Sequence, residues 1–93
     1  MKKAFYSLTN LTRGSEKITG VGYVADNQLI TAQYSSKKQK PYLKVWDCIK
    51  YCKNYNEEEQ IYSGFYTEYV EYQDKTIEID YKVWIKVIDD KEV

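Results

Sequence analysis

Residues 77–87 read IEIDYKVWIKV, and every odd position in this stretch carries an aliphatic or tyrosine side chain. Successive side chains of a β-strand point to opposite faces of its sheet, so a period of two predicts a strand with one buried face. The even positions between them are filled by Glu78, Asp80, Lys82, Trp84 and Lys86. We therefore expect a long strand here, packed on the core through its odd positions.

The segment before this strand, Gln60–Tyr72, is dense in aromatic residues and predicts a partner strand for it. A two-residue turn at Asp74–Lys75 would join the two strands into a long hairpin. The same register would place Glu71 opposite Glu78, and like charges repel when they lie directly across a sheet. A longer loop is therefore the alternative.

The first part of the chain predicts three further strands. Lys3–Leu8 has the composition of a short strand, and two β-prone runs between Ile18 and Tyr34 flank Asp26–Asn27. Asp and Asn tolerate the left-handed conformation that a two-residue hairpin turn requires. We expect the core side of this hairpin to carry Val21, Tyr23, Ile30 and Ala32, with Gly20 and Gly22 on the other side.

Pro41 suits the first turn of a helix, and an apolar stripe at helical spacing follows it. The stripe consists of Tyr42, Val45, Trp46, Ile49 and Cys52. An amphipathic helix is therefore predicted from Pro41 to Cys52, with its apolar side on the sheet.

These elements predict an α+β fold, with an antiparallel sheet of about five strands and one helix between strands three and four (β-β-β-α-β-β). A length of 93 residues suits a single domain covering residues 1–93. The same order of elements occurs in OB-folds, so an OB-like arrangement is a possibility by analogy at the level of the fold.

Composition predicts a folded, non-membrane protein. The chain is 43% hydrophobic, too much for a disordered chain, and 30% charged, too much for a membrane protein. The basic start Met1–Tyr6 is followed by polar residues, whereas a signal peptide would continue with an apolar run. We therefore expect a cytoplasmic location.

The residue inventory argues against an enzyme. The chain has no histidine, the commonest general base and metal ligand. A metal site on Cys48 and Cys52 would need two further thiolate or imidazole ligands, which the sequence lacks. We expect no catalytic residues, no metal and no cofactor, and we interpret the two cysteines as packing residues.

Charge is distributed unevenly along the chain. Residues 1–53 hold ten basic and three acidic side chains, whereas residues 54–93 hold four basic and eleven acidic ones, so the halves carry +7 and −7. Tyrosine is favoured at protein interfaces, and carboxylates beside it would complement a basic groove. The last hairpin is therefore the first candidate contact surface, with Glu68, Tyr69, Glu71, Tyr72, Glu78, Asp80 and Trp84 as its partner-binding residues. The opposing interpretation is that half of its tyrosines line the core and its carboxylates keep the sheet edge soluble.

The basic part of the chain supports a second hypothesis, binding of single-stranded nucleic acid. Lysines there would neutralise phosphates while exposed tyrosines stack on bases. The candidate residues are Lys37, Lys38, Lys40 and Lys44. A third hypothesis is a homo-oligomer assembled through the oppositely charged halves of the chain.

The leading hypothesis is a small, non-enzymatic protein-binding module whose partner is a host protein with a basic surface. Lys, Tyr, Ile and Asn are abundant, and their codons are AT-rich, which favours a low-GC bacterium or one of its phages as the source. Small size and the missing catalytic residues then suggest a phage or mobile-element inhibitor of a host defence protein, of the anti-CRISPR kind.

Overall fold

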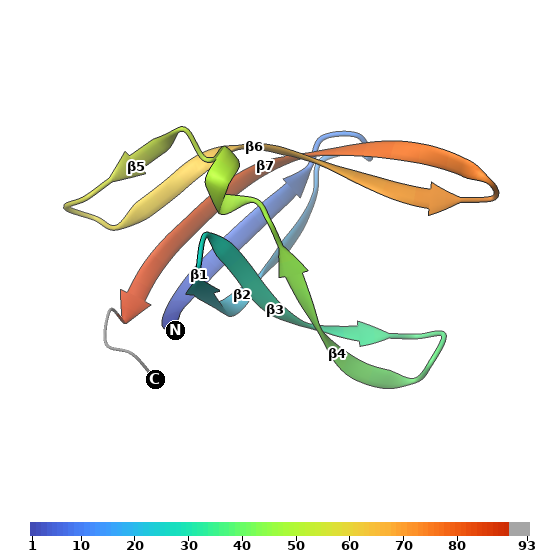
Figure 1. Cartoon of the computed structure of the whole chain (residues 1–93), viewed down its shortest axis with the longest axis horizontal. Helices are drawn as coiled ribbons and strands as arrows, with labels where there is room; N and C mark the ends of the chain where they lie inside the picture. Colours follow the sequence, from blue (N-terminus) through green and yellow to red (C-terminus); the bar gives the residue numbers. More distant parts are fainter. Residues whose placement is uncertain (90–93) are drawn as a thin grey trace.

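The computed structural model describes residues 1–89, which form one antiparallel sheet of seven strands (Figure 1). The strands are β1 (Lys2–Asn10), β2 (Glu16–Ala25), β3 (Gln28–Ser35), β4 (Lys40–Trp46), β5 (Asn54–Asn56), β6 (Ile61–Tyr72) and β7 (Lys75–Asp89). A single 3-10 turn, η1 (Ile49–Tyr51), lies between β4 and β5. The order across the sheet is β4-β3-β2-β1-β7-β6-β5, so β7 pairs with β1, the first strand of the chain.

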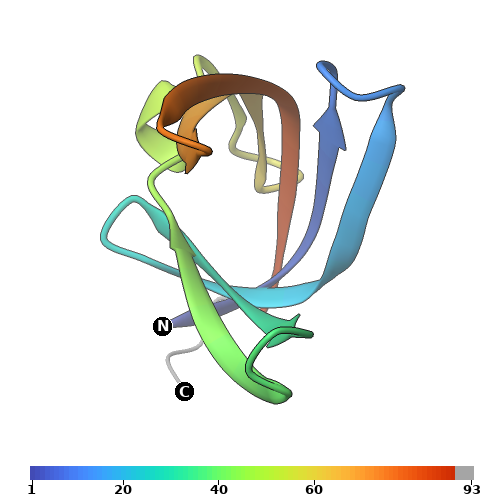
Figure 2. The same ribbon diagram turned by 90° about the vertical axis from the view of Figure 1, so that its right-hand side faces the viewer.

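The sheet is strongly coiled, and its two ends turn toward each other around a shared core (Figure 2). An ion pair links β4 to β6 across this opening, with the Lys44 Nζ 2.8 Å from the Glu68 Oε1. The concave side of the sheet is called the inner face below, and the opposite side the outer face. The buried apolar cluster on the inner side consists of Ala4, Tyr6, Leu8, Leu29, Trp46, Cys48, Ile49, Tyr81, Val83 and Ile85.

Strand β7 confirms the alternating pattern of residues 77–87. Tyr81, Val83 and Ile85 are buried, and β7 pairs with β1 on one side and with β6 on the other. Ile77 lies on the same face of β7 but is exposed, because the first third of β7 extends beyond the core. The β6–β7 hairpin is therefore packed on the core only at its base.

The register of this hairpin differs from the predicted one. Its turn residues are Gln73 and Asp74, both with positive φ, so the turn lies one position earlier in the chain than expected. Glu71 then lies opposite Thr76, whose hydroxyl donates a 2.8 Å hydrogen bond to the Glu71 carboxylate. This register avoids the repulsion between Glu71 and Glu78 that the predicted turn would have imposed.

The hairpin turn at Asp26–Asn27 is confirmed, and both turn residues have positive φ. The expected core side of this hairpin is wrong. Leu29 and Thr31 are buried, whereas Val21 is exposed on the outer face.

Two glycines of β2 explain why the inner face lies where it does. The aromatic ring of Tyr6 covers Gly20, where an added Cβ would lie 3.0 Å from the tyrosine hydroxyl oxygen. At Gly22 an added Cβ would lie 2.6 Å from the carbonyl oxygen of Ile30. Because Gly20 and Gly22 have no Cβ, the Tyr6 ring and the Ile30 carbonyl oxygen can approach this side of β2 closely. This side of the strand is therefore the inner face.

The predicted α+β class and its helix from Pro41 to Cys52 are wrong, because residues 1–89 contain no α-helix. Residues 40–46 form β4 instead, an edge strand, where proline is tolerated. Aromatic and β-branched residues favour a strand over a helix, and the inner side of β4 places Trp46 in the core. There the Trp46 indole N–H donates a 3.0 Å hydrogen bond to the Thr31 hydroxyl.

The OB-like analogy loses its basis with the helix, because it depended on a helix between the third and fourth strands. The sheet also has two strands more than the five expected, β4 and the short β5. The one helical element in the described part of the chain is η1, so no helix there has the length to span a membrane.

Candidate functional site

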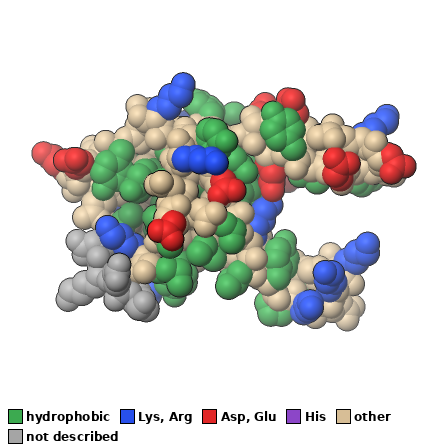
Figure 3. Space-filling model, viewed as in Figure 1, with side chains coloured by type: hydrophobic (Ala, Val, Ile, Leu, Met, Phe, Trp, Pro, Cys, Tyr) green, Lys and Arg blue, Asp and Glu red, His purple; other side chains and the backbone are tan. Residues whose placement is uncertain are grey.

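Two hairpins project from the same side of the core, and their charges are opposite (Figures 1 and 3). The acidic arm is the distal half of the β6–β7 hairpin, residues 67–80, and the basic arm is the β3–β4 hairpin, residues 30–45. In the space-filling view the red carboxylates of the acidic arm lie above a gap, and the blue lysines of the basic arm lie below it. Part of the charge separation along the sequence is therefore a separation between the two arms in space.

The outer face of the acidic arm gathers four of the seven predicted partner-binding residues. Tyr69 lies directly opposite Glu78, and Glu71 and Asp80 occupy the same face two residues further along their strands. The Tyr69 side chain is 65% exposed and all three carboxylates are exposed. The Thr67 hydroxyl donates a 2.7 Å hydrogen bond to the Asp80 carboxylate, which holds that side chain along the strand.

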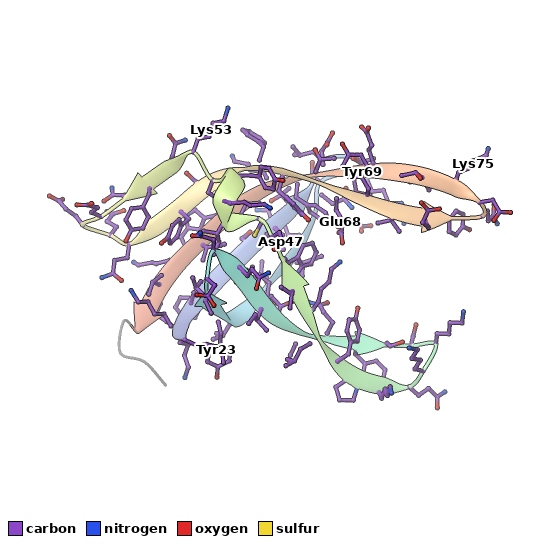
Figure 4. The ribbon with its side chains drawn as sticks, in the orientation of Figure 1. Tyr23, Asp47, Lys53, Glu68, Tyr69 and Lys75 are labelled. Atoms are coloured by element: carbon purple, nitrogen blue, oxygen red, sulfur yellow. The ribbon has the colours of Figure 1, made fainter. Side chains whose placement is uncertain are left out.

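Glu68 and Tyr72 do not belong to this surface, because even positions of β6 point to the inner side. Figure 4 shows Glu68 and Tyr69 on opposite sides of the β6 ribbon. Glu68 forms the ion pair with Lys44. Tyr72 lines an apolar pocket with Val70, Ile77, Ile79, Thr12 and Arg13. Two of the predicted contact residues therefore face the gap between the arms.

Trp84 lies on the outer face but outside the acidic arm. Its neighbours along that face of β7 are Lys82 and Lys86, and its cross-strand partner on β6 is Ser63. It lines a shallow groove that also includes Lys53 and Asn54. The structure therefore does not bring Trp84 together with the carboxylates.

Phe65 belongs to the same surface, although it is not among the residues predicted from the sequence. Its side chain is 67% exposed, and it shares the outer face of β6 with Thr67 and Tyr69. Tyr51, from η1, lines a small surface depression together with these residues. The period of two in β6 could have identified Phe65, because it lies four positions before Tyr69.

The basic arm brings together three of the four predicted lysines. Lys37, Lys38 and Lys40 surround the turn between β3 and β4, in a pocket whose walls include Tyr34 and Tyr42. All five side chains are exposed to solvent.

Lys44 is separate from this group of lysines. Its ammonium group lies 3.8 Å from the centre of the Trp46 ring and forms the ion pair with Glu68. It therefore ties the two arms together at their bases.

The two cysteines flank η1, with Cys48 buried at its start and Cys52 half-buried at its end. Burial raises the pKa of Cys48 to about 12, and burial raises the pKa of Cys52 to about 11. Both are therefore protonated near neutral pH, whereas the nucleophile and the metal ligand is the thiolate. Residues 1–89 contain no cluster of three or more His, Cys, Asp or Glu side chains placed to hold a metal ion.

No protein-family model, no curated protein and no solved structure matches the chain.

Proposed function

We propose that this protein is a non-catalytic binding domain that engages a basic surface of a protein partner through the outer face of the acidic arm. The observation that carries the proposal is the placement of Tyr69 among Glu71, Glu78 and Asp80 on one solvent-exposed face. Phe65 extends the same face toward the core.

The aromatic side chains supply the apolar contact in this proposal. Tyr69 and Phe65 each expose about two-thirds of their side chains, although burial of such rings is worth roughly 1.5–3 kcal/mol each. Tyrosine is enriched among the residues that contribute most to binding, because its ring is rigid and its hydroxyl still forms hydrogen bonds. Because Tyr69 and Phe65 lie on the same face of β6, one partner would bury both rings.

The carboxylates supply selectivity for a basic partner. Among the described residues the ion pairs comprise Lys44–Glu68 alone, so Glu71, Glu78 and Asp80 have no cationic partner within this part of the chain. A basic surface would supply those cations, and opposite potentials across an interface raise the association rate and exclude acidic competitors.

A capture experiment with two charge variants tests the proposal. The bait is the full chain, incubated with nuclease-treated lysate at low and at high salt. The acidic-arm variant carries Glu71→Gln, Glu78→Gln and Asp80→Asn, and the matched control carries Lys37→Gln, Lys38→Gln and Lys40→Gln at the tip of the basic arm. A basic protein retained by the parent and the control, but lost by the acidic-arm variant, supports the proposal.

The proposal is contradicted if the acidic-arm variant retains every partner of the parent. In that case the outer face of the acidic arm is not the site. The further hypothesis of a host defence protein as the partner stays a prediction, and the identity of the retained protein tests it.

The tip of the basic arm favours a second candidate function, binding of single-stranded nucleic acid. Lys37, Lys38 and Lys40 surround a pocket walled by Tyr34 and Tyr42, which combines cations for phosphates with rings for stacking. Titration of a labelled oligothymidylate at several salt concentrations tests this candidate. The triple lysine variant should lose roughly one unit of salt slope for each lost phosphate contact. Equal salt slopes for parent and variant would exclude the tip as the site.

A further inference from the structure

The outer face of the basic arm carries an uninterrupted apolar strip. Three cross-strand pairs form it, Ile30 with Val45, Ala32 with Leu43, and Tyr34 with Pro41. Leu43 is 72% exposed, Tyr34 is 65% exposed and Val45 is 50% exposed. None of the six side chains is charged. An exposed apolar surface of this kind marks an interaction site in a folded protein.

The strip lies between two charged ends. At its far end the turn of the basic arm carries Lys37 and Lys38. At its near end Asp26 lies in the β2–β3 turn and Asp47 directly follows β4. The Gln28 amide donates a 2.8 Å hydrogen bond to the Asp47 carboxylate, which continues the row of outer-face pairs beyond Ile30 and Val45. From its base to its tip, the surface of the hairpin is therefore first acidic, then apolar and finally basic.

We propose that a second copy of this chain covers the strip, related to the first by a two-fold axis through the Ala32–Leu43 pair. A two-fold interface uses the same patch on both subunits, so the patch must complement its own reverse. Reversal sets acidic against basic at both ends and apolar against apolar in the middle. Tyr34 of each copy then packs over Ile30 and Val45 of the other.

Charge complementarity selects a second copy over a partner of other chemistry. A uniformly basic partner would suit Asp26 and Asp47 but would repel the lysine tip, and an acidic partner would do the reverse. A second copy satisfies both ends at once. The chain also has a net charge of zero, so two copies approach without overall repulsion.

The apolar surface continues beyond the basic arm toward the size that an interface needs. A stable interface buries about 800 Å² per partner, more than a narrow strip supplies. Phe5 and Val21 are paired across β1 and β2, and both are exposed on the same outer face of the sheet. A copy seated on the strip could extend onto this pair.

This inference is independent of the proposed function, because the acidic arm takes no part in the contact. The charge variants of the acidic arm should therefore leave the dimer unchanged.

Sedimentation equilibrium of the full chain, from micromolar to millimolar concentration, tests the proposal. The parent should show a monomer–dimer equilibrium. Leu43→Asp should raise the dimer dissociation constant by about a hundredfold or more, because it places two charges against each other at the axis. The matched control is Phe65→Asp, which changes a similarly exposed apolar residue on the outer face of β6. It should leave the dimer unchanged.

A pair of charge variants and a cross-link sharpen the test. Lys37→Glu with Lys38→Glu should weaken the dimer, and mixing that protein with an Asp26→Lys, Asp47→Lys protein should restore a heterodimer. Leu43→Cys lies at the axis and should form a covalent dimer on mild oxidation, whereas Phe65→Cys should not.

Two outcomes would overturn the proposal. In the first, the parent sediments as a monomer over the whole concentration range. In the second, a dimer forms that Phe65→Asp disrupts and Leu43→Asp leaves intact. Circular dichroism and melting curves of each variant show that it is folded. If Leu43→Asp is unfolded, the two charge variants and their mixture decide the question. A monomeric parent that loses a lysate protein on Leu43→Asp would assign the strip to a different partner.

Discussion

The acidic and basic arms are both antiparallel hairpins that leave the same core, yet their two faces are used in opposite ways. The acidic arm has its unpaired carboxylates and exposed rings on the outer face, and its inner face is apolar at Val70 and Ile77. The basic arm has an apolar outer face, centred on Leu43, and polar residues such as Lys40 on its inner face.

The difference between the arms shows that apolar content alone does not identify the buried side of a hairpin. In the acidic arm the apolar side is the inner one, as an alternating strand predicts, although Val70 and Ile77 remain exposed because this arm extends beyond the core. In the basic arm the apolar side faces solvent, and the inner side is anchored on the core through Leu29, Thr31 and Trp46. The exposed strip of the basic arm is the surface that the proposed dimer would cover.

The largest expected effect is on the anchor of the basic arm. Trp46→Ala should lower the free energy of unfolding by about 3 to 5 kcal/mol, because it removes a buried indole and its hydrogen bond to Thr31. It also removes an edge-to-face contact with Tyr81, whose ring centre lies 5.4 Å away. Chemical denaturation measures the loss.

Tyr42→Ala is the matched control for the anchor. The helical stripe predicted from the sequence contains both Tyr42 and Trp46, whereas in β4 the Tyr42 side chain is exposed. The control should therefore cost less than about 1 kcal/mol, as expected for a surface substitution. Equal losses for the two variants would favour a helix over β4.

The next effect concerns the segment between the arms, where Cys48 is buried. Burial raises its thiol pKa from the ordinary 9.0 to about 12. The unfolded chain releases this proton as the pH passes 9, and the folded chain retains it, so the stability present below pH 9 is lost as the pH rises toward 12.

Denaturation curves between pH 9 and 10 measure this alkaline loss of stability. The slope for the parent should exceed that for Cys48→Ala by up to about 1.4 kcal/mol per pH unit. The comparison uses slopes, so the cavity that alanine leaves does not affect it. Parallel slopes would show that the Cys48 thiol ionises as easily in the folded chain as in the unfolded one.

A smaller effect is expected from the ion pair that ties the arms together. Lys44 and Glu68 are both partly exposed, so a double-mutant cycle with Lys44→Met and Glu68→Gln should give a coupling of about 0.5 to 1 kcal/mol. The coupling should decrease at high salt. A coupling of zero at low salt would mean that the arms are held by their core contacts alone.

The smallest effect is expected at the tip of the acidic arm. Gln73 and Asp74 both have positive φ, the conformation that an Asn-Gly pair adopts with least strain in a two-residue hairpin turn. Replacing them by Gln73→Asn and Asp74→Gly should stabilise the protein by about 0.5 kcal/mol. Thermal melting measures the gain, and a loss of stability would indicate a different turn.

These turns also show how far the sequence could predict the fold. Asp26–Asn27 was predictable, because both residue types tolerate positive φ. Gln73 gave no such signal, so the predicted turn was one position late. The strand of residues 77–87 was predictable from its strict period of two, which only one kind of element satisfies.

The helix predicted in place of β4 and the core side predicted for the β2–β3 hairpin were wrong, for two physical reasons. The residues of β4 satisfy both a helical stripe and an alternating strand, and pairing with β3 decides between them. Both faces of the β2–β3 hairpin are apolar, and the inner one is set by close contacts at Gly20 and Gly22 that no count of hydrophobic residues reveals.

The candidate site was predictable only in part. Four of the predicted residues share the outer face, because side chains alternate along each strand and the β6–β7 register aligns the outward-pointing positions. They are Tyr69, Glu71, Glu78 and Asp80. The predicted surface took in the whole hairpin and so included Glu68, although neighbours in a strand point to opposite faces. Choosing residues by alternation would have excluded Glu68 and Tyr72 and included Phe65.

The most direct test of the proposed function is a calorimetric titration of the partner isolated by capture, at two salt concentrations. The Glu71→Gln, Glu78→Gln, Asp80→Asn variant should bind at least about tenfold more weakly than the parent and with less salt dependence. The Lys37→Gln, Lys38→Gln, Lys40→Gln variant should bind as the parent does, and both should melt as the parent does. Unchanged binding by the acidic-arm variant, together with weakened binding by the lysine variant, would contradict the account and place the site on the basic arm.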